Sequence, residues 1–165
     1  MESFSGMPNT SRTWVYAANR TLTVPEQQQM QEALAVFTRD WTAHNNSLKA
    51  EAAILYNQFV VIMVDEAYNE IGGCSIDKSI QLLKALGNQY KIDFFNRFFI
   101  YVLDGNEIIT HTKQSLQEAI NKGLVNQDSL VFNHLVQSKS DLTNNWIQAL
   151  KQNWISKQLR FLVQA

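Results

Sequence analysis

The sequence predicts an α+β fold, in which a mainly antiparallel sheet is built from hairpins and helices pack chiefly on one face. Strand-like segments occur in adjacent pairs, residues 48–56 with 59–65 and residues 98–104 with 107–111. Helix-like segments separate the pairs. An order in which hairpins alternate with helices favours an α+β architecture over a doubly wound parallel sheet.

The strands are indicated by their hydrophobic patterns. Residues 59–65 (FVVIMVD) are almost continuously apolar, which is typical of a central strand covered on both faces. Residues 12–18 are predicted to form a first strand with Trp14 and Tyr16 on one face, because side chains alternate along a strand. Asp104 and Gly105 indicate a tight turn within the second pair. A short strand is expected at residues 131–133.

The helices are indicated by capping residues. Thr23, followed three residues later by Glu26, is a capping-box pattern that predicts the start of a first helix. Ser75 is the expected N-cap of a second helix over residues 76–87. Ser115 is the expected cap of a third helix over residues 115–122. A last helical region is expected after Ser140.

The length of 165 residues fits one domain. Residues 1–11 are rich in Ser, Asn, Gly and Pro and are expected to form a flexible leader. Residues 12–165 are expected to form a single α+β domain, with possible subdomains at residues 12–97 and 98–165.

Composition excludes several classes of function. The net charge of −1 provides little attraction for nucleic acid, so we expect no nucleic-acid partner. A single cysteine excludes an internal disulfide and a multi-cysteine metal site, and we predict no metal and no cofactor. No apolar stretch approaches the ~20 residues of a membrane-spanning helix, and the N-terminal residues lack a signal-peptide pattern. We therefore expect a cytoplasmic protein.

The stretch from Gly72 to Arg97 is the densest run of candidate site residues. Cys74 lies just before the predicted second helix, where free backbone amides stabilise a thiolate, so it is a candidate nucleophile. A catalytic cysteine also needs a base, and the sequence places none of the three histidines near it. The alternative is a small buried residue that fills space beneath the turn.

The same turn is also a candidate anion site. Gly72 and Gly73 would let an anion approach the amides at the helix start. Ser75 and Asp77 are interpreted first as capping residues and second as ligand-binding residues. The full set of ligand-binding candidates in this stretch is Gly72, Gly73, Cys74, Ser75, Asp77 and Arg97.

Two tryptophans are candidates for an exposed interaction surface. All four tryptophans, Trp14, Trp41, Trp146 and Trp154, are expected mostly in the core, but Trp146 and Trp154 lie in a region with less regular hydrophobic spacing and are the better candidates for exposure. Large aromatic side chains outside a periodic stripe are candidates for partner contacts.

Several short motifs resemble a family of short bacterial proteins of about this length, often labelled "ABC transporter ATPase". The motifs are Trp14-Val15-Tyr16, Trp41-Thr42-Ala43-His44, Gly73-Cys74-Ser75-Ile76-Asp77, Asp93-Phe94-Phe95-x-Arg97 and Val131-Phe132-Asn133. The resemblance covers nearly all of the chain after residue 12. Asn45-Asn46 stands where that family commonly has a glycine, and Asn96 stands where an aspartate is expected.

The label itself is not supported by chemistry. An ATPase of that type needs a phosphate loop of the form GxxxxGK[ST]. Gly72-Gly73 is followed by Cys-Ser-Ile-Asp, with no lysine at the required offset. We therefore predict no ATPase activity.

A second resemblance covers residues 101–146. A hairpin, a capped helix with a glycine stop, and a later tryptophan are together similar to the ββα unit of bacterial relatives of GYF adaptor domains. The resemblance implies a peptide-binding module.

These observations predict a small cytoplasmic binding or protein-interaction module without catalytic activity. Two alternatives stay open, a thiol-dependent enzyme that uses Cys74 with one histidine, and a small-anion binding domain at the Gly72–Asp77 turn. The identity of the partner and the oligomeric state do not follow from the sequence.

Overall fold

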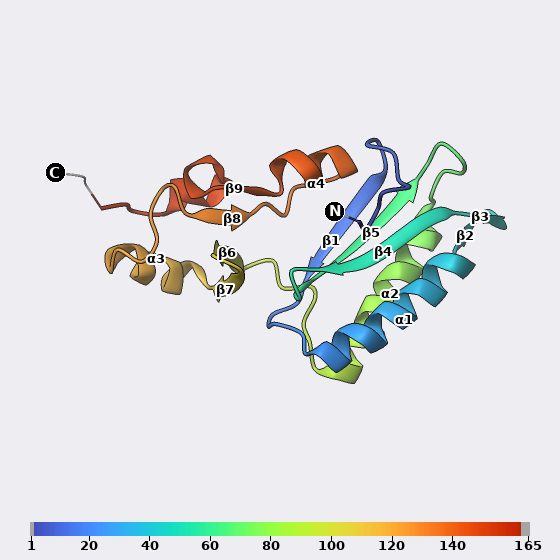
Figure 1. Ribbon diagram of the computed structural model, residues 1–165, viewed down its shortest axis with the longest axis horizontal. Coiled ribbons are helices and arrows are strands. Elements are labelled where there is room, and N and C mark those ends of the chain that lie inside the picture. The colour runs from blue at the N-terminus through green and yellow to red at the C-terminus, as the bar shows by residue number, and fades with distance from the viewer. Residues whose placement is uncertain (1, 163–165) are drawn as a thin grey trace.

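Two structural units lie side by side in the computed structural model, which describes residues 2–162 (Figure 1). Each unit contains an antiparallel sheet and its own helices, so the predicted α+β fold is confirmed. The strands are divided between two main sheets and one small hairpin.

The first unit is a three-stranded sheet with two long helices on one face (Figure 1). Its strands, in spatial order, are β1 (Arg12–Ala17), β5 (Phe59–Asp65) and β4 (Lys49–Leu55). The helices are α1 (Val24–Asp40) and α2 (Gly73–Tyr90). A small hairpin of β2 (Thr42–Ala43) and β3 (Asn46–Ser47) lies between α1 and β4 in the sequence.

The second unit is a four-stranded sheet with shorter helices. Its strands, in spatial order, are β7 (Glu107–His111), β6 (Ile100–Asp104), β8 (Leu130–Phe132) and β9 (Ile147–Ala149). Its helices are α3 (Lys113–Asn121), α4 (Lys139–Asn145) and the 3-10 helices η1 (Leu150–Gln152) and η2 (Trp154–Gln158).

The apolar strand β5 is the centre of the first unit, as its sequence predicts. It pairs with β1 on one side and β4 on the other, and all seven residues are buried. Val60, Ile62 and Val64 belong to a cluster with the helices, whereas the alternating residues Phe59, Val61 and Met63 belong to a second cluster. The strand therefore contributes side chains to two hydrophobic cores, one on each face of the sheet. Burying each such side chain stabilises the fold by about 1.5–3 kcal/mol.

The second cluster joins the two units. Phe59 packs against Phe132 and Trp146 of the second unit, with ring centroids 4.6 and 5.1 Å away. Phe4 and Met7, from the predicted leader, are buried in the same cluster, with 0% and 5% of their surface exposed. The helices thus cover one face of the first sheet, and the second unit covers the other.

The helix starts differ from the prediction at three of four positions, the last being α4, which is capped by Ser138 and begins at Lys139 rather than after Ser140. Thr23 and Glu26 form the predicted capping box, with hydrogen bonds of 3.3 and 2.8 Å. The second helix begins at Gly73 with Gly72 as N-cap, because the Ser75 hydroxyl donates instead to the Thr42 carbonyl at 2.7 Å. The third helix is capped by Thr112, and Ser115 completes the capping box from inside the helix.

None of the helices within residues 2–162 has both the length and the apolar character needed to cross a membrane.

Candidate functional site

The first candidate region is the start of α2, on which the β2–β3 hairpin is anchored. The indole nitrogen of Trp41 donates to the Ser75 carbonyl at 2.9 Å, and the Ser75 hydroxyl donates to the Thr42 carbonyl at 2.7 Å. His44 and Asn45 form the hairpin turn with φ values of 52° and 64°. This left-handed geometry matches the twist of a two-residue hairpin, so the turn has a defined orientation over the helix.

The hairpin places His44 beside the helix start. A Cβ atom at Gly72 would lie 3.6 Å from the His44 Nε2 atom, so the imidazole occupies space that glycine leaves open. Cys74 is exposed two residues further along, although the described residues contain no hydrogen bond between it and His44. The fold therefore places the His44 imidazole beside Gly72, two residues before Cys74 in the chain, which sequence spacing did not indicate.

Only some of the candidate anion-binding residues at this turn are exposed and free to contact an anion. Gly73 and Asp77 are exposed, but Ser75 is buried and its hydroxyl is already bonded to Thr42. Asp77 adds a negative charge one turn from the free amides, which opposes an anion there. Of these features, only the free backbone amides at the start of α2 favour binding of an anion.

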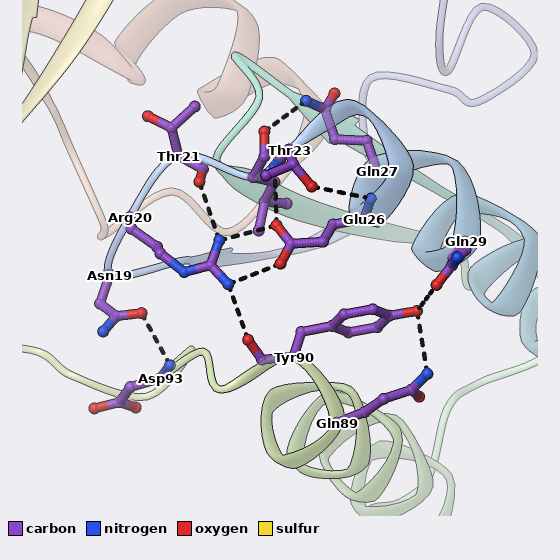
Figure 2. Close-up of polar contacts among 11 residues, drawn as sticks. Asn19, Arg20, Thr21, Thr23, Glu26, Gln27, Gln29, Gln89, Tyr90 and Asp93 are labelled. Atoms are coloured by element: carbon purple, nitrogen blue, oxygen red, sulfur yellow. Dashed lines mark hydrogen bonds and ion pairs between the residues drawn. The ribbon is translucent and has the colours of Figure 1, made fainter.

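The second candidate region lies at the opposite end of α2, where Arg20 joins three segments (Figure 2). Its guanidinium makes two hydrogen bonds to the Glu26 carboxylate, at 2.9 and 2.8 Å, and one to the Tyr90 carbonyl at 2.9 Å. The Arg20 hydrogen bonds hold the pKa of Glu26 at about 2. The connection between β1 and α1 is thereby tied to the last turn of α2.

The chain that leaves α2 forms the junction loop, residues 91–99, which connects the two units. The Asn19 side chain accepts a hydrogen bond from the Asp93 amide at 3.0 Å (Figure 2). Asp93 and Asn96 then accept hydrogen bonds from the amides of Phe95 and Phe98, each at 2.9 Å. Such side-chain turns replace water as the partner of backbone amides, so the loop has a defined conformation.

The junction loop exposes two of its phenylalanines. Phe94 is 4% exposed, whereas Phe95 is 39% and Phe98 is 86% exposed. Arg97, between them, is exposed and makes no ion pair within residues 2–162. Apolar side chains held outward on an ordered backbone form a candidate contact surface.

A hollow of about 340 Å³ adjoins Phe95, one of the two exposed phenylalanines. It is lined by Leu83, Lys84, Gly87, Asn88, Ile92, Asp93 and Phe95. The Phe95 ring packs edge-on against Tyr16 at 5.7 Å, and the Lys84 ammonium lies 6.0 Å from its centroid. The hollow is therefore lined by both apolar and polar residues, and Lys84 and Asp93 bring one positive and one negative side chain to it.

A second hollow, of about 470 Å³, lies between α1 and β4. Four of its six lining residues are polar, Gln27, Gln28, Gln31 and Glu32, with Ala35 and Ile54, although most of the lining surface is apolar. The side-chain amide nitrogen of Gln31 donates to the Ala52 carbonyl of β4, and its side-chain oxygen accepts from the Ile54 amide. This side chain protects the backbone of an edge strand, so a structural role accounts for the polar lining.

The two tryptophans that are candidates for an interaction surface, Trp146 and Trp154, differ in exposure. Trp154 is 53% exposed. Trp146 is instead 3% exposed, because it lies in the aromatic cluster between the two units. Its indole nitrogen is buried there and has no hydrogen-bond partner within residues 2–162.

Sequence reasoning did not name Lys84, Phe95 and Phe98 among the candidate site residues. A usable signal was present in residues 93–98 (DFFNRF), where Asp93 and Asn96 each precede a phenylalanine by two residues. That spacing is typical of side-chain-capped turns.

Among residues 2–162, no three His, Cys, Asp or Glu side chains are grouped in a way that could hold a metal ion. Comparisons of this chain with protein-family models, curated proteins and solved structures found no match.

Proposed function

We propose that this protein is a small cytoplasmic protein-interaction module that binds a partner protein through the junction loop and its adjoining hollow. The observation that carries the proposal is the exposure of Phe95 and Phe98 on a backbone held by two successive side-chain turns. The resemblance of residues 101–146 to GYF relatives supports the same class of function.

The energetics favour binding at this loop. Moving a phenylalanine side chain from water into an interface is worth about 1.5–3 kcal/mol. The turns at Asp93 and Asn96 have already ordered the backbone, so a partner loses little of this gain to ordering the loop. Phenylalanine and arginine are also enriched at interfaces.

The chemistry of the surface defines the partner. Leu83, Ile92 and Phe95 in the lining of the hollow would contact an aliphatic or aromatic side chain of the partner. Lys84 lies 6.0 Å from the Phe95 ring, Arg97 is exposed two residues after Phe95, and these two positive charges would favour a carboxylate in the partner. We therefore expect a protein segment in which an apolar residue is flanked by Asp or Glu.

A peptide-display selection against the purified protein tests this surface. Selected peptides are expected to carry an apolar residue next to an acid, and Phe98→Ala should weaken their binding by about tenfold or more. Arg97→Ala should weaken it by a smaller factor, with a steeper loss at low salt. Binding is measured by fluorescence anisotropy.

Leu124→Ala is the matched control, because Leu124 is 76% exposed and lies outside the junction loop. It should leave affinity unchanged. Selected peptides that bind Phe98→Ala and the unmodified protein equally well would contradict the proposal.

A second candidate function, a thiol-dependent activity of Cys74, is favoured by the position of His44 beside Gly72. The imidazole would accept the thiol proton, and the thiolate would attack an electrophilic carbon. His44→Gln is therefore expected to slow alkylation of Cys74 by iodoacetamide by about fivefold or more near neutral pH, as followed by mass spectrometry.

His134→Gln serves as the control for the alkylation experiment, since His134 packs against Tyr101 in the second unit. Its rate should equal that of the unmodified protein. Equal rates for His44→Gln and the unmodified protein would rule out a role for the imidazole.

A further inference from the structure

The segment before β1 is bound to the rest of the protein in the manner of a peptide ligand. Phe4 and Met7 are buried, whereas Ser5, Gly6 and Pro8 are exposed. The Met7 amide donates to the Phe4 carbonyl at 3.0 Å, which closes a turn that directs both buried side chains to the same side. Two anchors separated by exposed residues are typical of short-peptide recognition.

Side chains from both units hold the backbone of this segment. The Phe4 amide donates to a Glu51 carboxylate oxygen of β4 at 2.7 Å. The Lys139 ammonium of α4 donates to the Phe4 carbonyl at 2.8 Å and also to the Met7 carbonyl. A carboxylate and an ammonium thus recognise main-chain groups that any peptide carries.

The anchors enter the cluster that joins the two units. Phe4 and Met7 share this cluster with Ala53 and Met63 of the first sheet. Val136 and Leu142 contribute to it from the second unit. Figure 1 shows the N-terminal segment on the side of the first sheet that α4 approaches. We define Glu51, Lys139 and these four apolar residues as the anchor site.

We propose that the anchor site is a peptide-binding site occupied in cis by residues 3–8, and that a partner peptide with an aromatic residue followed three positions later by methionine displaces them. This site is separate from the junction loop and does not depend on the function proposed for that loop. The chain's own segment defines the ligand chemistry, namely two apolar anchors and a free backbone amide and carbonyl between the two charges.

Displacement is physically reasonable because the cis segment is strained. Phe4 has a φ of 66°, in the left-handed region that is unfavourable for a bulky residue. Glu51 and Lys139 are both only partly buried, so water can replace their bonds when the segment leaves.

The direct test uses the full chain with Phe4→Ala and Met7→Ala, which removes both anchors, and a fluorescent peptide of residues 2–12 as the probe. The variant is expected to bind the peptide about tenfold or more tightly than the unmodified protein, whose site is filled. A peptide with alanine at the Phe4 position should not bind. A variant with native circular dichroism that binds no better than the unmodified protein would overturn the proposal.

A second measurement covers the case in which the variant does not fold. In the unmodified protein, the hydrogen-bonded amides of Phe4 and Met7 should exchange with deuterium about tenfold or more faster than those of Val61 and Met63. Equal exchange rates would show that the segment opens only with global unfolding, and would overturn displacement. A dimer that exchanges the segment between chains would instead assign the site to a second copy and also overturn the partner proposal.

Discussion

Replacing Gly87 by alanine is expected to lower the free energy of unfolding by about 1–3 kcal/mol, the range typical of an overpacked site. A Cβ atom at this position would lie 2.6 Å from the Ile92 carbonyl oxygen and 3.7 Å from the Phe94 ring. The oxygen belongs to the backbone, which is held by the bond from the Ile92 amide to the Gly87 carbonyl at 2.9 Å. The loop must therefore shift to admit a methyl group.

Gly73→Ala is the matched control for this substitution. Gly73 lies in the same helix, and a Cβ atom there would meet nothing within 4 Å. Because alanine is a better helix former than glycine, this change should not lower stability. Urea unfolding monitored by circular dichroism compares the two variants, and equal stabilities would contradict the close packing described for Gly87.

The Gly87 substitution also links the fold to the proposed function. Gly87 lines the hollow beside the junction loop, and Ile92 and Phe94 belong to that loop. A shift of the loop should weaken peptides selected on Phe98, whereas Gly73→Ala should leave their affinity unchanged.

Glu26→Gln is expected to lower the free energy of unfolding by about 1–2 kcal/mol near neutral pH. The Arg20 hydrogen bonds lower the pKa of Glu26 from 4.5 to about 2. Each unit of pKa shift corresponds to about 1.4 kcal/mol, but solvent screens the pair because the Arg20 side chain is 40% exposed. Glutamine keeps the capping box while it removes the charge, so the change isolates the ion pair.

The pH dependence of this effect has a definite sign. A carboxyl group whose pKa is lower in the folded state contributes its full stabilisation above its unfolded pKa, here 4.5. That stabilisation is lost as the pH falls from 4.5 towards about 2, where Glu26 becomes protonated in the folded protein. The stability difference between the unmodified protein and Glu26→Gln should shrink over the same interval.

Asp40→Asn provides the control for pH. Asp40 pairs with Arg39, but both side chains are largely exposed, at 62% and 70%. Because such pairs are strongly screened, we expect no measurable change in stability. A difference for Glu26→Gln that does not vary between neutral and acidic pH would contradict the role of the Arg20–Glu26 pair.

Features with a local cause could be predicted from sequence. The capping box at Thr23 and Glu26 depends on residues three apart, and it is present as predicted. The continuous apolar pattern of Phe59–Asp65 requires burial on both faces, and this strand is central and fully buried. The alternation of hairpins and helices was sufficient for the α+β class.

Features that depend on distant partners could not be predicted in this way. Ser75 has a good N-cap sequence, yet its hydroxyl bonds to Thr42, 33 residues earlier in the chain. Phe4 and Met7 lie in a polar segment, but the face that buries them is assembled from both units. Trp146 is buried for the same reason.

The candidate site regions likewise combine features that the sequence predicted and features that only the fold decided. The sequence by itself determined that residues 72–97 contain a glycine-marked helix start, a single cysteine and an aromatic segment after the helix. Only the tertiary structure placed His44 beside Gly72, buried Phe94 and left Phe95 and Phe98 exposed. The physical reason is that capping and periodicity act within a few residues, whereas exposure depends on which other segments cover a side chain.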